Sequence, residues 1–106
     1  MASVESSVAD CSGNLVQRPP SITLECGDGK DTLIDLTWTS WTTAHSEGSG
    51  QEEVTECIPD CADGTPHRTP VQVVLTDPQA VPGESATKFQ YAVISGAAGS
   101  RTERLS

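Results

Sequence analysis

The sequence predicts an all-β fold: a small disulfide-stapled sandwich or barrel of five to six antiparallel strands, with mobile termini. Short alternating runs rich in β-branched residues are separated by Gly- and Pro-rich turns, and no helical period is longer than a turn or two. A chain of 106 residues is long enough for one domain. We expect a flexible N-terminal arm at residues 1–18, a single β domain at residues 19–96 and a flexible C-terminal tail at residues 97–106.

The hydrophobic core is expected to be thin. Leu, Ile, Val and Phe make up only 20 of the 106 residues, and the net charge is -9. This composition lies close to that of disordered chains, so the core needs a supplement. Two disulfide bonds would add roughly 2–4 kcal/mol each by restricting the unfolded chain. The four cysteines are therefore predicted to be structural.

The first half of the domain is predicted to contain a hairpin. Pro19 and Pro20 impose an extended entry, and residues 21–26 alternate between apolar and polar side chains as in a half-buried strand. Residues 27–30, Gly-Asp-Gly-Lys, form a hairpin loop because two glycines accept positive φ. The return strand spans about residues 32–43.

The return strand does not alternate regularly. Ile34, Leu36 and Trp38 fall on one face, whereas Trp41 breaks the period. This break predicts either a bulge near Ser40 or a second tryptophan on the outer face. Structural roles for both tryptophans are favoured, because a thin core needs large side chains.

The second half of the domain is predicted to add further strands. Residues 44–51 are expected to form a flexible loop, and residues 51–56 a short exposed edge strand whose three glutamates deter edge pairing. The next strand begins at Pro70 and ends at Asp77-Pro78, with one face formed by Val71, Val73 and Leu75.

The last predicted strand spans about residues 88–95, after a loop at residues 79–85. Its alternation places two sets of side chains on opposite faces: Phe89, Tyr91 and Val93 on one, and Ala92 and Ile94 on the other.

The cysteines allow three pairings, and we favour Cys11–Cys26 with Cys57–Cys61. The alternative crosses the two halves of the chain, as Cys26–Cys57 with Cys11–Cys61. A zinc site would use Cys57, Cys61 and His67 with Cys26 or His45 as fourth ligand, but structural zinc usually presents two compact ligand pairs. A redox pair at Cys57 and Cys61 lacks the helix start that lowers a thiol pKa. Disulfides are favoured.

The charge distribution argues against several partners. Residues 1–65 carry a net charge of -10, which repels nucleic acids and anionic lipids. No apolar run approaches the roughly 18 residues needed for membrane insertion. Asp28, Asp31 and Asp35 could form a weak calcium site, but their spacing does not match a calcium-binding loop. We therefore expect neither a metal nor another cofactor.

The sequence also argues against an enzyme. His45 and His67 are the only possible imidazole bases, and no Gly-x-Ser-x-Gly motif accompanies them. A hydrolase built on one of these histidines is kept only as a third hypothesis. The candidate binding residues are Trp41 and Trp38, if exposed, because aromatic side chains often anchor partners. Ile58, Pro59 and Asp60 join them, because a stiff loop loses less entropy on binding.

Four motifs lie within roughly residues 20–76: Ser-Ile-Thr-Leu-x-Cys-Gly-Asp-Gly at 21–29, Leu-Thr-Trp-Thr-Ser-Trp at 36–41, Cys-x-Pro-x-Cys-Ala-x-Gly at 57–64 and Pro-Val-x-Val at 70–73. Together they resemble those of a group of small exported proteins of actinobacteria, mycobacteria and streptomycetes among them. The resemblance implies export and a cysteine-stapled domain, and it carries no activity and no catalytic residues.

The compartment expected from the cysteines is also extracellular, secreted or in the cell envelope. The start of the sequence lacks the basic and apolar regions of a signal peptide. We expect the mature part of an exported protein, with Met1 added for expression.

The leading hypothesis is a monomeric, non-enzymatic binding or structural module that meets an unknown protein or a cell-envelope polysaccharide. The alternative is a small secreted inhibitor or effector that presents the loop between Cys57 and Cys61 to a partner enzyme.

Overall fold

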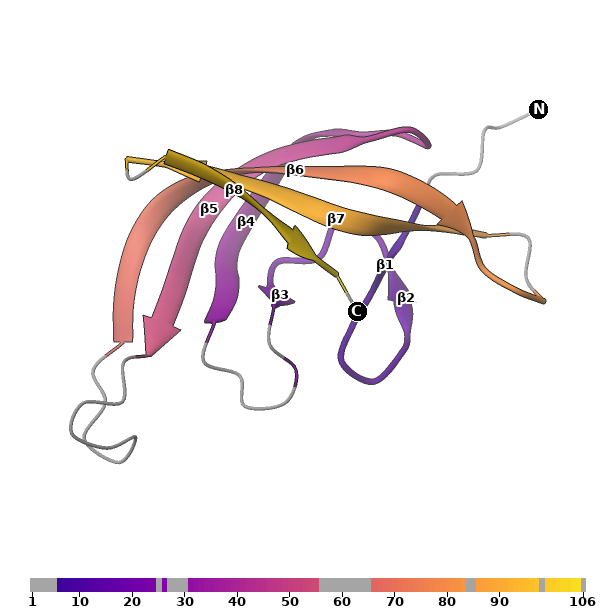
Figure 1. Cartoon of the computed structure of the whole chain (residues 1–106), viewed down its shortest axis with the longest axis horizontal. Helices are drawn as coiled ribbons and strands as arrows, with labels where there is room; N and C mark the ends of the chain where they lie inside the picture. Colours follow the sequence, from indigo (N-terminus) through magenta and orange to yellow (C-terminus); the bar gives the residue numbers. More distant parts are fainter. Residues whose placement is uncertain are drawn as a thin grey trace.

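The computed structural model describes residues 6–24, 26, 31–55, 66–83, 86–97 and 99–105. Within these ranges the regular structure is entirely β (Figure 1). In chain order the strands are β1 (Val8–Ala9), β2 (Leu15–Val16), β3 (Ile22–Thr23), β4 (Asp31–Trp41), β5 (Ser46–Thr55), β6 (Pro66–Ala80), β7 (Thr87–Gly96) and β8 (Gly99–Arg104).

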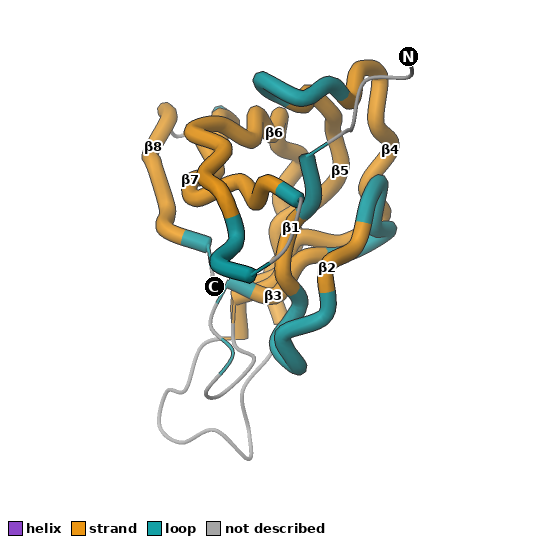
Figure 2. The backbone as a smooth tube through the Cα atoms, turned by 90° about the vertical axis from the view of Figure 1, so that its right-hand side faces the viewer, coloured by secondary structure: helices purple, strands orange, loops and turns teal. Residues whose placement is uncertain are grey.

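Strands β3 to β8 form one antiparallel sheet in the order of the sequence, and β1 and β2 form a separate hairpin. The all-β antiparallel class is thereby confirmed. The sheet does not lie flat: β4, β5 and β6 bend together, and the strands curl around an interior (Figures 1 and 2). A curled sheet buries one face against itself, as a small barrel does.

The N-terminal segment closes this curl. Ser7 exchanges two backbone hydrogen bonds with β7, since its N–H donates to the Thr87 carbonyl at 2.9 Å and its carbonyl accepts from Phe89 N–H at 2.9 Å. Ser6 is fully buried, and its carbonyl accepts a hydrogen bond from the indole N–H of Trp41 at 2.7 Å. The segment therefore joins the end of β4 to the start of β7. The expectation of a flexible arm is wrong for its described residues.

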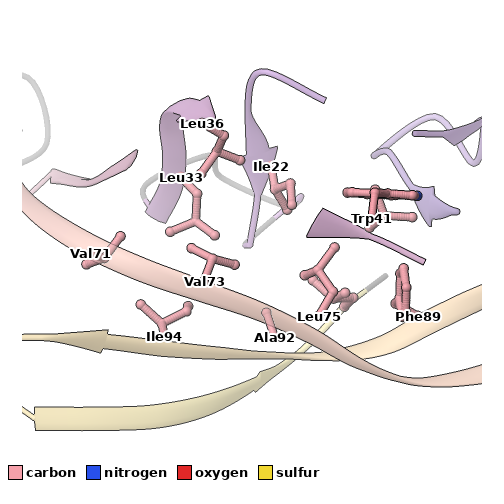
Figure 3. Packing of buried hydrophobic residues seen from close by; sticks show 12 residues of the cluster. Ile22, Leu33, Leu36, Trp41, Val71, Val73, Leu75, Phe89, Ala92 and Ile94 are labelled. Atoms are coloured by element: carbon pink, nitrogen blue, oxygen red, sulfur yellow. The ribbon is translucent and has the colours of Figure 1, made fainter. Parts of the chain in front are cut away.

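The core lies inside the curl, where side chains from β3 and β4 face those of β6 and β7 (Figure 3). The predicted face of Val71, Val73 and Leu75 is confirmed, with at most 6% of each residue exposed. The buried hydrophobic residues are Val8, Ile22, Leu33, Leu36, Trp41, Val71, Val73, Leu75, Phe89, Ala92, Ile94 and Leu105.

Two irregularities in β4 decide which of its side chains enter the core. The register against β5 shifts between Ile34 and Thr37, where Asp35 has a φ of 53°, and again between Trp38 and Ser40. Each shift inserts one residue and reverses the facing side. Leu33 rather than Ile34 is therefore buried, which corrects the expected face. The second shift confirms the predicted bulge near Ser40 and turns Trp41 inward.

Strand β5 corrects two expectations, a loop at residues 44–51 and an exposed edge strand at residues 51–56. It runs through Ser46–Thr55 and lies between β4 and β6. Its inward positions carry no hydrophobic side chain between Ser46 and Glu52, only Gly48 and Gly50. A Cβ atom at Gly50 would lie 2.5 Å from the Ile34 carbonyl oxygen and 2.9 Å from Leu36 Cδ2. Glycine is required because β4 approaches too closely for any side chain.

Strands β6 and β7 extend beyond their predicted limits. β6 begins at Pro66 and continues past Asp77, whose φ is 57°, to Ala80. On β7, the buried set is Phe89, Ala92 and Ile94, so the predicted separation of Phe89 from the other two is wrong. Leu75 pairs with Ala92, and Pro78 pairs with Phe89. The face of β7 that points into the core therefore changes between Ala92 and Phe89, opposite Asp77 on β6.

The C-terminal residues are part of the sheet, which corrects the expected tail at 97–106. β8 pairs with β7 from Gly96↔Gly99 to Tyr91↔Arg104. Beyond the strand, Leu105 is 7% exposed, and its N–H donates to the Gln90 carbonyl at 2.7 Å. This segment has little apolar pattern, because only one of its side chains enters the core.

The disulfide bond between Cys11 and Cys26 is present, with a Cα–Cα distance of 5.4 Å. It links the β1–β2 hairpin to the residues after β3. β3 itself is shorter than the strand expected at residues 21–26. Cys57 and Cys61, and the expected hairpin loop at 27–30, lie outside the described residues.

Gly50→Ala is expected to destabilise the protein by about 1–3 kcal/mol, because the added methyl group has no room between β4 and β5. Urea unfolding followed by tryptophan fluorescence measures this change. Ser49→Ala, at the adjacent position of the same strand, is the matched control. Equal stability of the two variants would show that the close approach of β4 imposes no constraint.

Candidate functional site

Both tryptophans make specific contacts within the fold. Trp41 is 7% exposed, and its ring makes edge-to-face contacts with Trp38 at 4.8 Å and Phe89 at 5.8 Å between ring centroids. Trp38 is half-buried, and its indole N–H donates to the Pro19 carbonyl at 2.8 Å. The expectation that Trp41 is an exposed contact residue is therefore wrong. Its ring packs against Trp38 and Phe89, and its N–H donates to the Ser6 carbonyl. Ile58, Pro59 and Asp60 lie outside the described residues.

Trp41→Phe is expected to cost about 1–3 kcal/mol of unfolding free energy, because the buried Ser6 carbonyl loses its donor while most of the ring packing remains. Trp38→Phe removes an equivalent donor at a partly solvated position and should cost less. Chemical denaturation of both variants provides the comparison. A larger loss of unfolding free energy for Trp38→Phe would contradict the greater importance of the hydrogen bond from Trp41 to Ser6.

A second set of polar residues meets inside one end of the curl, where β4, β5 and β8 converge. Arg101 on β8 donates through Nη1 to Glu52 Oε1 at 3.1 Å, and its Nη2 also bonds Oε2 of that residue. The same Nη2 lies 3.5 Å from Asp31 Oδ2, and Nε donates to Glu103 Oε1 at 2.8 Å. Glu52 is 8% exposed. One guanidinium group therefore bridges three carboxylates from three strands.

Burial and the neighbouring Glu52 carboxylate raise the pKa of Asp31 to about 7. The hydrogen bonds from Arg101 lower the pKa of Glu52 despite its burial, and those to Glu52 raise the pKa of Arg101. The Asp31 Oδ1 atom is buried without a hydrogen-bond partner among the described residues. The raised pKa favours the protonated, uncharged form of the Asp31 carboxyl group below about pH 7, which lowers the cost of burying it.

A protonated acid beside a carboxylate is also the pattern of an acid–base pair in an enzyme. The size of the site opposes that role here. The cavity lined by Glu52 and Arg101 has a volume of about 120 Å³, whereas small-molecule sites usually have about 300–1,000 Å³. The cluster lies at the end of the core, beside a cavity that is smaller than most ligand sites.

The described residues include several of the ligands considered for a zinc or a calcium site. Cys26 is consumed by its disulfide bond with Cys11, which removes it as a zinc ligand. Asp31 is engaged by Arg101, while Asp35 is exposed on the outside of the first β4 bulge. Among the described His, Cys, Asp and Glu residues, no group of three or more is arranged to hold a metal ion.

Asp31→Asn is expected to stabilise the protein above pH 7, by roughly 1–2 kcal/mol after allowance for solvent screening. The folded protein retains the Asp31 proton up to about pH 7, whereas the unfolded chain releases it near the ordinary aspartate pKa of 3.8. Parent stability therefore falls as the pH rises through this interval, and the amide cannot ionise.

Unfolding free energies measured from pH 4 to pH 8 test this expectation. Asp35→Asn makes the same chemical change at an exposed position and is the matched control. Parallel profiles for Asp31→Asn and the parent would show that the buried carboxyl group does not retain its proton.

One groove lies between the β1–β2 hairpin and the turn after β6. It has a volume of about 590 Å³, and its walls include Leu15, Val81 and Pro82. A smaller cavity of about 220 Å³, lined by Val16, Pro19 and Ile22 among others, lies on the other side of residues 9–11. The segment held by the disulfide bond thus separates two concave surfaces.

The polar groups of the larger groove differ in how they are used. Asp10 Oδ1 accepts from the backbone N–H groups of Ser12 and Asn14, both at 2.9 Å, and so shapes the hairpin. Lys88 also lines the groove, and no carboxylate among the described residues forms an ion pair with it. The groove therefore offers an ammonium group beside apolar walls.

Sequence reasoning missed both the groove and the cluster around Arg101. Residues 10–14, Asp-Cys-Ser-Gly-Asn, do carry a turn signal that indicates the hairpin. Nothing in the sequence indicates that Arg101 meets Glu52, because they are 49 positions apart and β8 has little apolar pattern.

The described residues contain no helix that is long and apolar enough to cross a membrane. Comparison with protein families, curated proteins and solved structures finds no match to this chain.

Proposed function

We propose that this chain is a non-enzymatic exported domain that acts as a binding module, or a structural one, at the cell surface or in the medium. The observation that supports this best is the groove of about 590 Å³ framed by the disulfide-linked hairpin. Its volume matches ligand sites in general, and one wall belongs to a segment that the disulfide restrains. A restrained wall loses little conformational entropy when a ligand binds.

The chemistry of the groove favours a ligand with an anionic group and an apolar portion. Lys88 provides an ammonium group that pairs with no carboxylate among the described residues, and Leu15, Val81 and Pro82 provide apolar contact. Carboxylate-bearing segments of a cell-envelope polysaccharide, or of a protein, have this character. The proposed location outside the cell rests on the Cys11–Cys26 bond, because such bonds persist mainly in oxidising compartments.

Soluble, carboxylate-bearing fragments of cell-envelope polysaccharide are the probe for this proposal. Nuclear magnetic resonance titration is expected to shift amide signals of residues 9–15 and 81–88. Lys88→Gln should weaken binding about tenfold, the equivalent of one hydrogen bond to a charged group. Lys88→Arg retains the charge and is the matched control. Shifts confined to other residues would refute the assignment of this groove, and cleavage of the fragments would refute the non-enzymatic role.

The alternative role, a secreted inhibitor that presents the loop between Cys57 and Cys61, makes a different prediction. A protease panel would then be inhibited by stoichiometric amounts of the protein, and Ile58→Ala or Pro59→Ala would relieve the inhibition. These positions lie outside the described residues. If polysaccharide fragments fail to bind and a protease is inhibited in this way, the alternative replaces the leading proposal.

A further inference from the structure

β8 is one of the two edge strands of the six-stranded sheet; the other is β3, which has only two residues. β8 is the last strand in the sheet order, and no described residue pairs with its outer side (Figure 2). At the opposite end, β4 is covered by β3 and by Pro20, whose carbonyl accepts from Leu36 N–H at 3.0 Å. An exposed strand edge is a template for another strand.

Alternate residues of β8 direct their backbone groups outward. Leu105 N–H donates to the Gln90 carbonyl, so the odd-numbered residues of this segment face β7. In an antiparallel ladder the neighbouring residues then point their N–H and C=O groups away from the partner strand. Ser100, Thr102 and Arg104 therefore present unused donors and acceptors at the edge, and all three residues are exposed.

We infer that this edge binds a second copy of the chain, with the two β8 strands antiparallel and Thr102 opposite Thr102 of the second copy. In this register Ser100 lies opposite Arg104, and all the outward backbone groups find partners. Arg101 lies opposite Glu103 of the second copy, at the positions where facing side chains come closest. The charge pattern of the strand thus complements itself.

Charged side chains on an edge strand usually deter pairing with another strand. On β8 the same charges oppose the two registers next to the one proposed, but not the proposed register itself. A shift in one direction places Arg101 opposite Arg101 of the second copy, and a shift in the other places Glu103 opposite Glu103. Like charges that face one another directly destabilise a pair of strands. The favoured register is further supported by Glu103, because only Oε1 accepts from Arg101 within the chain. Its Oε2 atom can accept from Arg101 of the second copy.

The geometry also limits how far the assembly can grow. Pairing of one edge with the same edge is isologous, so the contact closes as a two-fold dimer and leaves no further β8 edge. A strand of six residues gives a small contact, and small contacts are typical of weak, reversible complexes. This inference goes beyond the proposed function and does not depend on the groove.

Light scattering on the full chain from about 10 µM to 1 mM is expected to show the mass rising towards that of a dimer. Thr102→Lys places two ammonium groups opposite one another and should raise the dissociation constant about fivefold. Gln72→Lys adds the same charge at an exposed position on β6 and is the matched control. A monomer throughout this range would overturn the inference, as would equal effects of the two substitutions.

Cross-linking tests the register itself. Facing Cα atoms at Thr102 would lie about 5.5 Å apart, within reach of a disulfide bond, so Thr102→Cys should form a covalent dimer on oxidation. The Ser100 positions of the two copies would lie about 14 Å apart, so Ser100→Cys should remain uncross-linked. Since both variants carry the same number of cysteines, this comparison controls for disulfide exchange. Equal cross-linking would overturn the proposed pairing, and preferential pairing with an unrelated extended peptide would overturn the assignment to a second copy.

Discussion

The fold depends on one contact, the placement of residues 6 and 7 between the end of β4 and the start of β7. The Ser6 carbonyl satisfies the indole N–H of Trp41, and Ser7 pairs with Thr87 and Phe89. Without this segment, the sequentially ordered sheet would have an open seam between β4 and β7, with Trp41 and Phe89 beside it. The Cys11–Cys26 bond reinforces the closure from outside, because it ties the hairpin that follows the segment to residues beyond β3.

The small core follows from the curl that this closure allows. Strand β5 contributes Gly48 and Gly50 where most central strands contribute large apolar side chains, and the absence of Cβ atoms lets β4 approach closely. The far end of the interior is closed by Arg101 and its carboxylates instead of by hydrophobic packing. Burial of charge is costly even when the charges are paired. The cluster therefore specifies the arrangement of β4, β5 and β8 more than it adds net stability.

This division of the molecule separates its structural residues from its candidate contact surfaces. The tryptophans, the glycines of β5 and the cluster around Arg101 are all engaged inside the fold. The surfaces that we propose for partners are the groove beside the disulfide-linked hairpin and the outer edge of β8. β8 pairs with residues 91–96 of β7, whereas Lys88 lies nearer the start of that strand. A ligand in the groove and a strand at the edge could therefore bind at the same time.

The sequence by itself determined the all-β class and the strand face of Val71, Val73 and Leu75. It favoured the Cys11–Cys26 pairing among three possible ones, and it left a bulge near Ser40 as one of two explanations for the broken alternation at Trp41. Each of these rests on local alternation or on short spacing. Only the tertiary structure decided that Ser46–Thr55 is a central strand, that Trp41 is buried and that residues 6–9 and 99–105 belong to the fold. These segments are polar or rich in glycine, and their places depend on backbone pairing with distant strands, which leaves little hydrophobic pattern in the sequence.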